Sequence, residues 1–210
     1  MAYDLQEQES LDELKAWWEK WGTLTMTAVT IVCVGFAAHN GWKWYQRSQA
    51  AEAAVAYSAL QDSIIRRADV AQIEKITDKM LADTGSTVYA ALGAMSTAKH
   101  FETVGDVAKA GKYLTWVINE SERPEYNTIA RVRLAGLKID EKRFDEAKKL
   151  LADAKPGEKE VALVKDRMGD ILFAQGDMTG ARQQWQAALT HPIDATLAGF
   201  INLKLQALPE

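Results

Sequence analysis

The hydrophobic positions near the N-terminus form one long run, which predicts a membrane-spanning helix. The 22 residues between Lys20 and Lys43 contain no Asp, Glu, Lys or Arg. At about 1.5 Å per residue the run is roughly 33 Å long as a helix, enough to cross a hydrocarbon core of about 30 Å. Both ends carry aromatic side chains of the kind that favours the membrane–water interface, namely Trp17, Trp18, Trp21, Trp42, Trp44 and Tyr45. We therefore predict a transmembrane helix over residues 21–45, embedded in the lipid bilayer.

Four threonines, Thr23, Thr25, Thr27 and Thr30, dilute the hydrophobicity of this run. Their hydroxyls can donate to backbone carbonyl groups one turn earlier, so they weaken the prediction without excluding it. Two other interpretations stay open, a buried core helix and a cleavable signal peptide. A signal peptide begins with a short positive region, whereas residues 1–20 hold six acidic side chains and two lysines, which favours a retained anchor.

Residues 1–20 are predicted to form an acidic tail followed by an interfacial helix. Ser10 and Glu13 have the spacing of a capping box, which predicts that a helix begins at Ser10. Apolar residues follow at near-helical spacing, as in a helix that lies in the membrane interface. Two basic residues precede the apolar run and two follow it closely, so the charges alone leave the orientation in the membrane open.

From residue 46 onward the hydrophobic pattern is helical throughout, with Gly or Pro at turn-like intervals, so the predicted fold class is all-α. Positions that suit close helix packing recur after 34 residues, the period of tetratricopeptide repeats. Small side chains are needed where two helices cross closely, and large ones fill the space between repeats. The predicted packing positions are Ala98, Ala110, Ala135, Ala147, Ala154, Gly169, Ala181, Trp185 and Ala188.

This period predicts a solenoid of helical hairpins over residues 46–210, with repeats at about 91–124, 128–157 and 162–195. A terminal repeat must cover one apolar face, so we expect capping helices at 47–83 and 194–207. In the last helix, Leu197, Phe200, Ile201 and Leu205 have the spacing of a buried face. A generic helical bundle with a chance echo at 34 residues is the alternative.

Composition and charge exclude several classes of function. A net charge of −4 and a pI near 5.5 argue against a nucleic-acid-binding protein. The single cysteine forms no internal disulfide. The three histidines, His39, His100 and His191, lack the spacing of metal ligands, and no nucleotide-binding glycine loop or nucleophile motif occurs. We therefore expect no enzyme activity, no metal and no cofactor.

A surface that binds protein is the function that remains. Stacked hairpins form a superhelix whose concave wall is lined by the first helix of each repeat. The repeat register places nine residues on this candidate wall for binding peptides: Met95, Lys99, Glu102, Val132, Ile139, Asp140, Asp166, Asp170 and Phe173.

The order of these features resembles one known family, the YfgM-type ancillary subunit of the bacterial SecYEG translocon. The resemblance rests on the acidic tail, Gly41-Trp42-Lys43-Trp44-Tyr45, Tyr89-Ala90-Ala91-Leu92-Gly93-Ala94, Arg131-Val132-Arg133-Leu134-Ala135, and Gly169-Asp170-Ile171-Leu172 with the later Gly176-Asp177, Ala181-Arg182 and Trp185. It implies an inner-membrane protein of a Gram-negative bacterium with a cytoplasmic N-terminus and a periplasmic repeat domain. It also implies three partners, the SecYEG translocon, a membrane-anchored periplasmic chaperone of the PpiD type, and nascent secreted chains.

The leading hypothesis is a non-enzymatic adaptor that the anchor holds beside the translocon, where confinement raises the effective concentration of weak contacts. Within the anchor, Cys33, Ala37 and Gly41 share one helical face and are candidates for contact with another transmembrane helix. The alternative hypothesis is a homo-oligomeric scaffold for assembly or division of the cell envelope. An enzyme with a site outside known patterns is a third hypothesis.

Overall fold

The computed structural model describes residues 2–209, with side chains for residues 10–209 except that of residue 124. Every regular element in this range is a helix, as predicted from the sequence. The elements are α1 (Ala2–Ile65), α2 (Val70–Thr84), α3 (Val88–Thr103), α4 (Val107–Asn119), α5 (Pro124–Asp140), α6 (Phe144–Ala152), α7 (Val161–Ala174), α8 (Met178–Ala188) and α9 (Ala195–Gln206). The chain divides into two units, residues 1–49 and 50–210, and α1 contributes to both.

Helix α1 begins earlier than the sequence predicted. The capping-box motif placed the helix start at Ser10, but the helix already begins at Ala2. Residues 2–9 include Leu, Gln and Glu, which are good helix formers, and no Gly or Pro. Because nothing in these residues stops a helix, the capping-box motif lies inside α1 instead of at its start.

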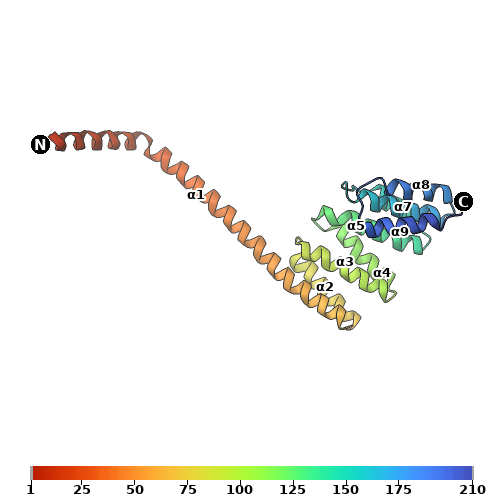
Figure 1. Cartoon of the computed structure of the whole chain (residues 1–210). Coiled ribbons are helices and arrows are strands. Elements are labelled where there is room, and N and C mark those ends of the chain that lie inside the picture. The colour runs from red at the N-terminus through yellow and green to blue at the C-terminus, as the bar shows by residue number, and fades with distance from the viewer. Residues whose placement is uncertain (1, 210) are drawn as a thin grey trace. The chain divides into compact units, whose positions relative to one another are not determined.

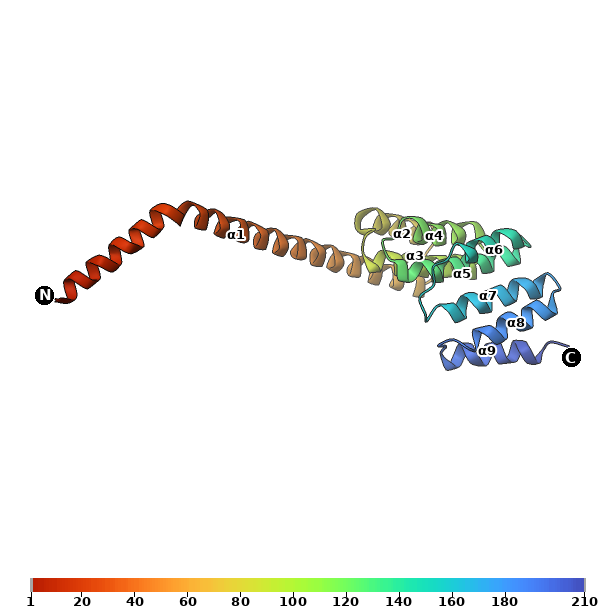
Figure 2. The same cartoon turned by 90° about the horizontal axis from the view of Figure 1, so that it is seen from above.

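Residues 50–209 form a series of helical hairpins (Figures 1 and 2). Helices α3 and α4, α5 and α6, and α7 and α8 each pair across a short turn, one hairpin at each of the three predicted repeats. Buried side chains from α3, α4 and α5 form one core cluster, and those from α5, α6 and α7 form the next. Each hairpin therefore packs on its neighbour, as expected for a solenoid.

A fourth hairpin precedes these three, where the sequence suggested only capping helices. The end of α1 packs against α2 through Leu60, Ile73 and Met80, all of which are buried. The turn between them has the same geometry as the turns of the other hairpins. In each, one residue has a positive φ, Arg67 (54°), Gly105 (83°), Lys142 (59°) or Gly176 (85°). The next amide then donates to the carbonyl five residues earlier, at 2.8 to 2.9 Å, which is the Schellman arrangement of a helix end.

The residues predicted for close packing are buried, with one exception. Ala98, Ala110, Ala135, Ala147, Gly169, Ala181, Trp185 and Ala188 all lie in the core. At Gly169 the helices approach so closely that an added Cβ would overlap the indole of Trp185. Ala154 is only half-buried and lies beyond α6, which ends at Ala152. Pro156 disfavours helical backbone at the residue before it, so this helix ends earlier than α8, its counterpart in the next repeat.

Helix α9 covers the last hairpin. Ile201 is fully buried and Leu197 and Leu205 are partly buried, all in one cluster with Trp185 of α8. Phe200 was expected on the same face, but it is 59% exposed. The buried face of α9 is thus narrower than its hydrophobic pattern suggested.

Candidate protein-binding groove

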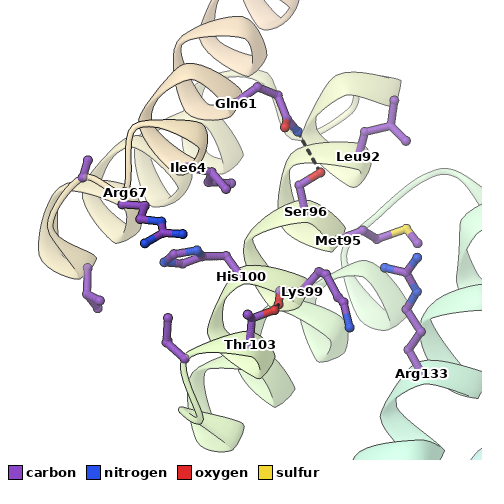
Figure 3. Close-up of a pocket in the computed structure, with 13 residues that line it drawn as sticks. Gln61, Ile64, Arg67, Leu92, Met95, Ser96, Lys99, His100, Thr103 and Arg133 are labelled. Atoms are coloured by element: carbon purple, nitrogen blue, oxygen red, sulfur yellow. Dashed lines mark hydrogen bonds between the residues drawn. The ribbon is translucent and has the colours of Figure 1, made fainter.

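A groove opens between the first helices of three successive hairpins, and it is the best-formed concavity of residues 50–209 (Figure 3). It has a volume of about 810 Å³ and is lined by the end of α1, by α3 and by Arg133 of α5. Ligand sites in proteins commonly have volumes of this order. We refer to this concavity, with the side chains named below, as the groove.

Apolar side chains make up much of the groove surface. Ile64, Val70, Leu92, Met95 and Val104 line it. Val104 is 52% exposed and follows α3, whereas Met95 is buried to 7% exposure and also belongs to the core. An unbranched methionine adapts its shape to different neighbours more easily than other apolar side chains. The lining therefore offers an adaptable apolar surface.

Polar groups of α1 and α3 lie along the same groove. The side-chain amide of Gln61 donates to the hydroxyl of Ser96 at 2.9 Å, which connects α1 to α3 (Figure 3). Lys99 is exposed and pairs with Glu102 one turn along α3, with 3.0 Å between Nζ and Oε2. The Nε2 atom of His100 is buried and has no hydrogen-bond partner in the described part of the chain. A buried polar atom without a partner is costly, so this nitrogen marks a place where a ligand would gain a hydrogen bond.

The first-repeat residues of the predicted wall lie at or beside this groove. Met95 and Lys99 line it, and Glu102 is the ion-pair partner of Lys99. The second-repeat residues do not extend the groove. Val132 is buried and Ile139 partly buried in the core between α5 and α7, and Asp140 is exposed at the end of α5.

The third-repeat residues of the predicted wall are mostly covered by α9. Nζ of Lys204 lies 2.7 Å from Oδ1 of Asp166 and 2.6 Å from Oδ1 of Asp170. The indole nitrogen of Trp185 donates to the backbone carbonyl of Asp166 at 3.1 Å. Phe173 remains 45% exposed, with its ring centroid 5.7 Å from that of Trp185. The two aspartates therefore hold α9 in place and leave no open wall there.

Burial sets the electrostatics of this ion-pair cluster. Asp166 has only 6% of its surface exposed. Loss of hydration raises the pKa of the Asp166 carboxyl above its usual value, although the ammonium of Lys204 acts in the opposite direction. Lys204 is therefore needed to compensate a carboxylate that the protein has removed from water.

The predicted anchor lies in the first unit. Within residues 10–65, α1 contains a stretch that is long and apolar enough to cross a membrane, judged by length and composition. The hydroxyls of Thr25, Thr27 and Thr30 donate to carbonyl oxygens one turn earlier at 2.7 to 2.9 Å, as expected from the sequence. These bonds satisfy the hydroxyls within the helix, which lowers the cost of placing them in lipid.

The aromatic residues at the two ends of this stretch are exposed. The rings predicted for the membrane interface are 44% to 71% exposed: Trp17, Trp18, Trp21, Trp42, Trp44 and Tyr45. Cys33, Ala37 and Gly41 are exposed as well, and a Cβ added at Gly41 would meet no atom within 4 Å. Their assignment as contacts of lipid headgroups and of another helix remains a prediction.

Among residues 2–209, no group of three or more His, Cys, Asp or Glu side chains is placed to hold a metal ion. The groove therefore offers apolar surface, cationic groups and hydrogen-bonding groups as its means of recognition. These groups suit non-covalent binding of another molecule.

Comparison with known proteins places this architecture in a family. Residues 15–210 match the family described as "Tetratricopeptide repeat-like domain". The chain belongs to this family. It is 26% identical to the "Ancillary SecYEG translocon subunit" of Haemophilus influenzae over 193 residues, which cover 90% of this chain and 91% of that protein. Proteins of the same name from Escherichia coli and Neisseria gonorrhoeae are 25% and 26% identical, over 84% and 99% of this chain and 85% and 100% of theirs. The resemblance inferred from the residues is confirmed, and no solved structure matches.

In this tetratricopeptide repeat-like domain, three groove residues had no place in the sequence prediction as binding groups. Arg67 lies in the turn of the first hairpin, which the sequence did not reveal because Arg replaces the usual glycine there. His100 was interpreted only as a surface or turn residue. Arg133 lies next to Val132, which the repeat register selected instead. A shift of one residue along α5 would have pointed to the arginine.

Proposed function

We propose that this protein is a membrane-tethered, non-enzymatic adaptor of the SecYEG translocon. Its N-terminal helix anchors it in the bacterial inner membrane, and its repeat domain lies in the periplasm. There the repeat domain binds a membrane-anchored chaperone of the PpiD type, emerging secreted chains, or both. The observation that carries this proposal is the similarity, over 84% to 99% of the chain, to proteins named as ancillary translocon subunits.

Two features of the structure support the proposal. The apolar part of α1 is almost entirely exposed, with 6% of its most apolar window buried, which suits a helix surrounded by lipid better than a core helix. The groove is an open concavity lined by apolar and cationic groups, which suits recognition of a polypeptide. Tethering makes weak binding in the groove sufficient, because it holds the domain close to its partners.

Photo-crosslinking in native membranes tests this proposal. A photoreactive amino acid is placed at Lys99, in the groove, or at Lys75, an exposed residue of α2 outside it. We expect Lys99 to give adducts with translocon subunits, a chaperone or secreted chains, and Lys75 to give few. Protease added from the periplasmic side should digest the repeat domain. Digestion only from the cytoplasmic side, or absence of any translocon or chaperone adduct, would contradict the proposal.

The anchor provides a second test. Replacing Ala37 and Gly41 with Leu should reduce co-purification of membrane partners in mild detergent, because bulky side chains prevent close approach of another helix. Gly35 lies on the opposite helical face, and a Cβ there would also meet no atom within 4 Å. Gly35→Leu is therefore the matched control and should leave co-purification unchanged. Equal recovery with both variants would show that this face makes no helix contact.

One observation favours the second candidate, a homo-oligomeric scaffold. Phe200 and Leu203 are 59% and 62% exposed on α9, one turn apart on the terminal helix. Crosslinking from Phe200 would distinguish the two functions. Adducts of the protein with itself or with division proteins, in place of translocon adducts from the groove, would support the scaffold.

A further inference from the structure

The side chains that line the groove are basic wherever they are charged. Four of them, Arg67, Lys99, His100 and Arg133, are basic, and the lining contains no Asp or Glu. Residues 46–210 hold 22 basic and 23 acidic side chains, a net charge of −1. The groove is therefore a cationic site in a nearly neutral domain.

Two of these cations have no partner within the described residues. Neither Arg67 nor Arg133 takes part in an ion pair or hydrogen bond there, and both side chains are exposed. Most other arginines of the domain do have one. Arg143 pairs with Glu146 at 2.6 Å and Arg167 with Asp170 at 3.1 Å. Unpaired guanidinium groups beside an apolar surface are well suited to bind carboxylates, which they can hold through two parallel hydrogen bonds.

The arrangement of the cations indicates an extended ligand with several anionic groups. Figure 3 shows Arg67 beside His100 at one side of the groove and Arg133 at the other, with Lys99 of α3 between them. A single phosphate or lipid headgroup would need these cations to converge on one point. Acidic side chains spaced along a polypeptide would instead meet them in turn.

The neutral part of the lining completes this description of the ligand. Ile64, Met95 and Val104 offer apolar surface between and beside the cations. The buried Nε2 of His100 lacks a hydrogen-bond partner, which a carboxylate or backbone carbonyl of the ligand would supply.

We propose that the groove between α1, α3 and α5 binds a polypeptide segment in which acidic residues alternate with apolar ones. In this complex Arg67 and Arg133 bind two carboxylates of the segment, and Met95 and its apolar neighbours pack against its apolar side chains. The inference rests on the proposed adaptor function and specifies the chemistry of its partner.

The test measures binding of short, end-blocked synthetic peptides to the full-length protein in non-ionic detergent. In the first peptide Glu alternates with Leu, in the second Gln replaces Glu, and in the third Lys replaces Glu. Each carries a neutral fluorophore, and anisotropy with empty micelles is subtracted. We expect the Glu peptide to bind at least tenfold more tightly than the others, since a hydrogen-bonded charge commonly accounts for about tenfold in affinity. Higher ionic strength should weaken its binding.

Arginine variants locate the site. Arg67→Gln and Arg133→Gln should each weaken binding of the Glu peptide by about tenfold. Arg133→Lys keeps the charge but loses the planar fork, so it should retain part of the affinity. Arg66→Gln is the matched control, because Arg66 is the neighbour of Arg67, pairs with Asp62 on the surface and lies outside the groove lining. It should change the affinity less than twofold. Circular dichroism and thermal unfolding verify that each variant is folded.

Several outcomes would overturn this inference. Equal affinity for the three peptides would exclude charge recognition, and full affinity in the folded Arg67→Gln/Arg133→Gln double variant would exclude this groove. Arginine-dependent binding to nanodiscs containing phosphatidylglycerol, without binding of the Glu peptide, would identify a lipid site instead. Co-purification with the translocon is measured in parallel. If it persists while peptide binding fails, only this inference falls. If wild-type protein recovers no translocon, the proposed function itself fails.

Discussion

Lys204 is predicted to hold the terminal helix on the repeat domain. The Lys204→Met variant keeps most of the aliphatic volume but removes the ammonium that contacts Asp166 and Asp170 at 2.7 and 2.6 Å. The side chain of Asp166 is only 8% exposed, so the change leaves a buried carboxylate without its cation. Removing one partner of a fully buried ion pair costs about 3–5 kcal/mol.

The expected loss is smaller than this range because the cluster is partly hydrated. The side chain of Lys204 is 31% exposed and that of Asp170 is 19% exposed, so we expect about 2 kcal/mol. For a domain of this size, that loss lowers the midpoint of thermal unfolding by about 4–8 °C. Circular dichroism of the full-length protein in non-ionic detergent measures the midpoint, and hydrogen exchange of residues 195–206 shows whether α9 opens first. Lys79→Met, at an exposed lysine of α2, should change stability by less than about 0.5 kcal/mol.

The pH dependence separates the ionic contribution from packing. Burial raises the pKa of Asp166 in the folded state above its unfolded value, so ionised Asp166 opposes folding and protonation relieves that cost. The relief grows as the pH falls through the folded pKa, and without Lys204 that pKa should be higher still. The deficit of Lys204→Met should therefore shrink between about pH 7 and about pH 5. Unchanged stability, or the same deficit at both pH values, would refute this reasoning.

Two further predictions concern backbone positions of the hairpins. Gly169→Ala should destabilise the protein by about 1–3 kcal/mol, because the new Cβ overlaps the indole of Trp185, whereas Gly199→Ala should stabilise it by about 0.5–1 kcal/mol because nothing lies within 4 Å there; urea unfolding of both variants measures the difference, and equal effects would contradict the packing argument. Gly176→Ala should cost about 1 kcal/mol at a φ of 85°, while Lys142→Gly, at 59°, should gain up to about 1 kcal/mol, and a loss of stability in Lys142→Gly would show that strain is absent from that turn.

The hydrophobic pattern predicted the helical fold and the close helix crossings because both depend on local spacing. Gly169, Ala181 and Ala188 repeat at intervals that the helix geometry itself imposes, and all three are buried. The first hairpin escaped prediction because Arg67, a residue that rarely adopts a positive φ, stands where glycine is expected.

The predicted wall was less accurate because it depends on contacts that are remote in sequence. Lys204 reaches Asp166 across 38 residues, and no local pattern reveals that α9 covers this part of the concave side. Val132 and Arg133 differ by one helical position, yet the first is buried and the second exposed. A repeat register with an uncertainty of one residue cannot distinguish them.

The first hairpin affects how fragments of this protein can be made. Its first helix is the final part of α1, and Leu60 on that helix is buried against Ile73 and Met80. A truncation that starts at Ala50 keeps this contact, whereas one that starts after Ile65 strips an apolar layer from α2 and leaves it open to aggregation. Recombinant versions lacking the hydrophobic segment should therefore retain the helical turns from Ala50 onward.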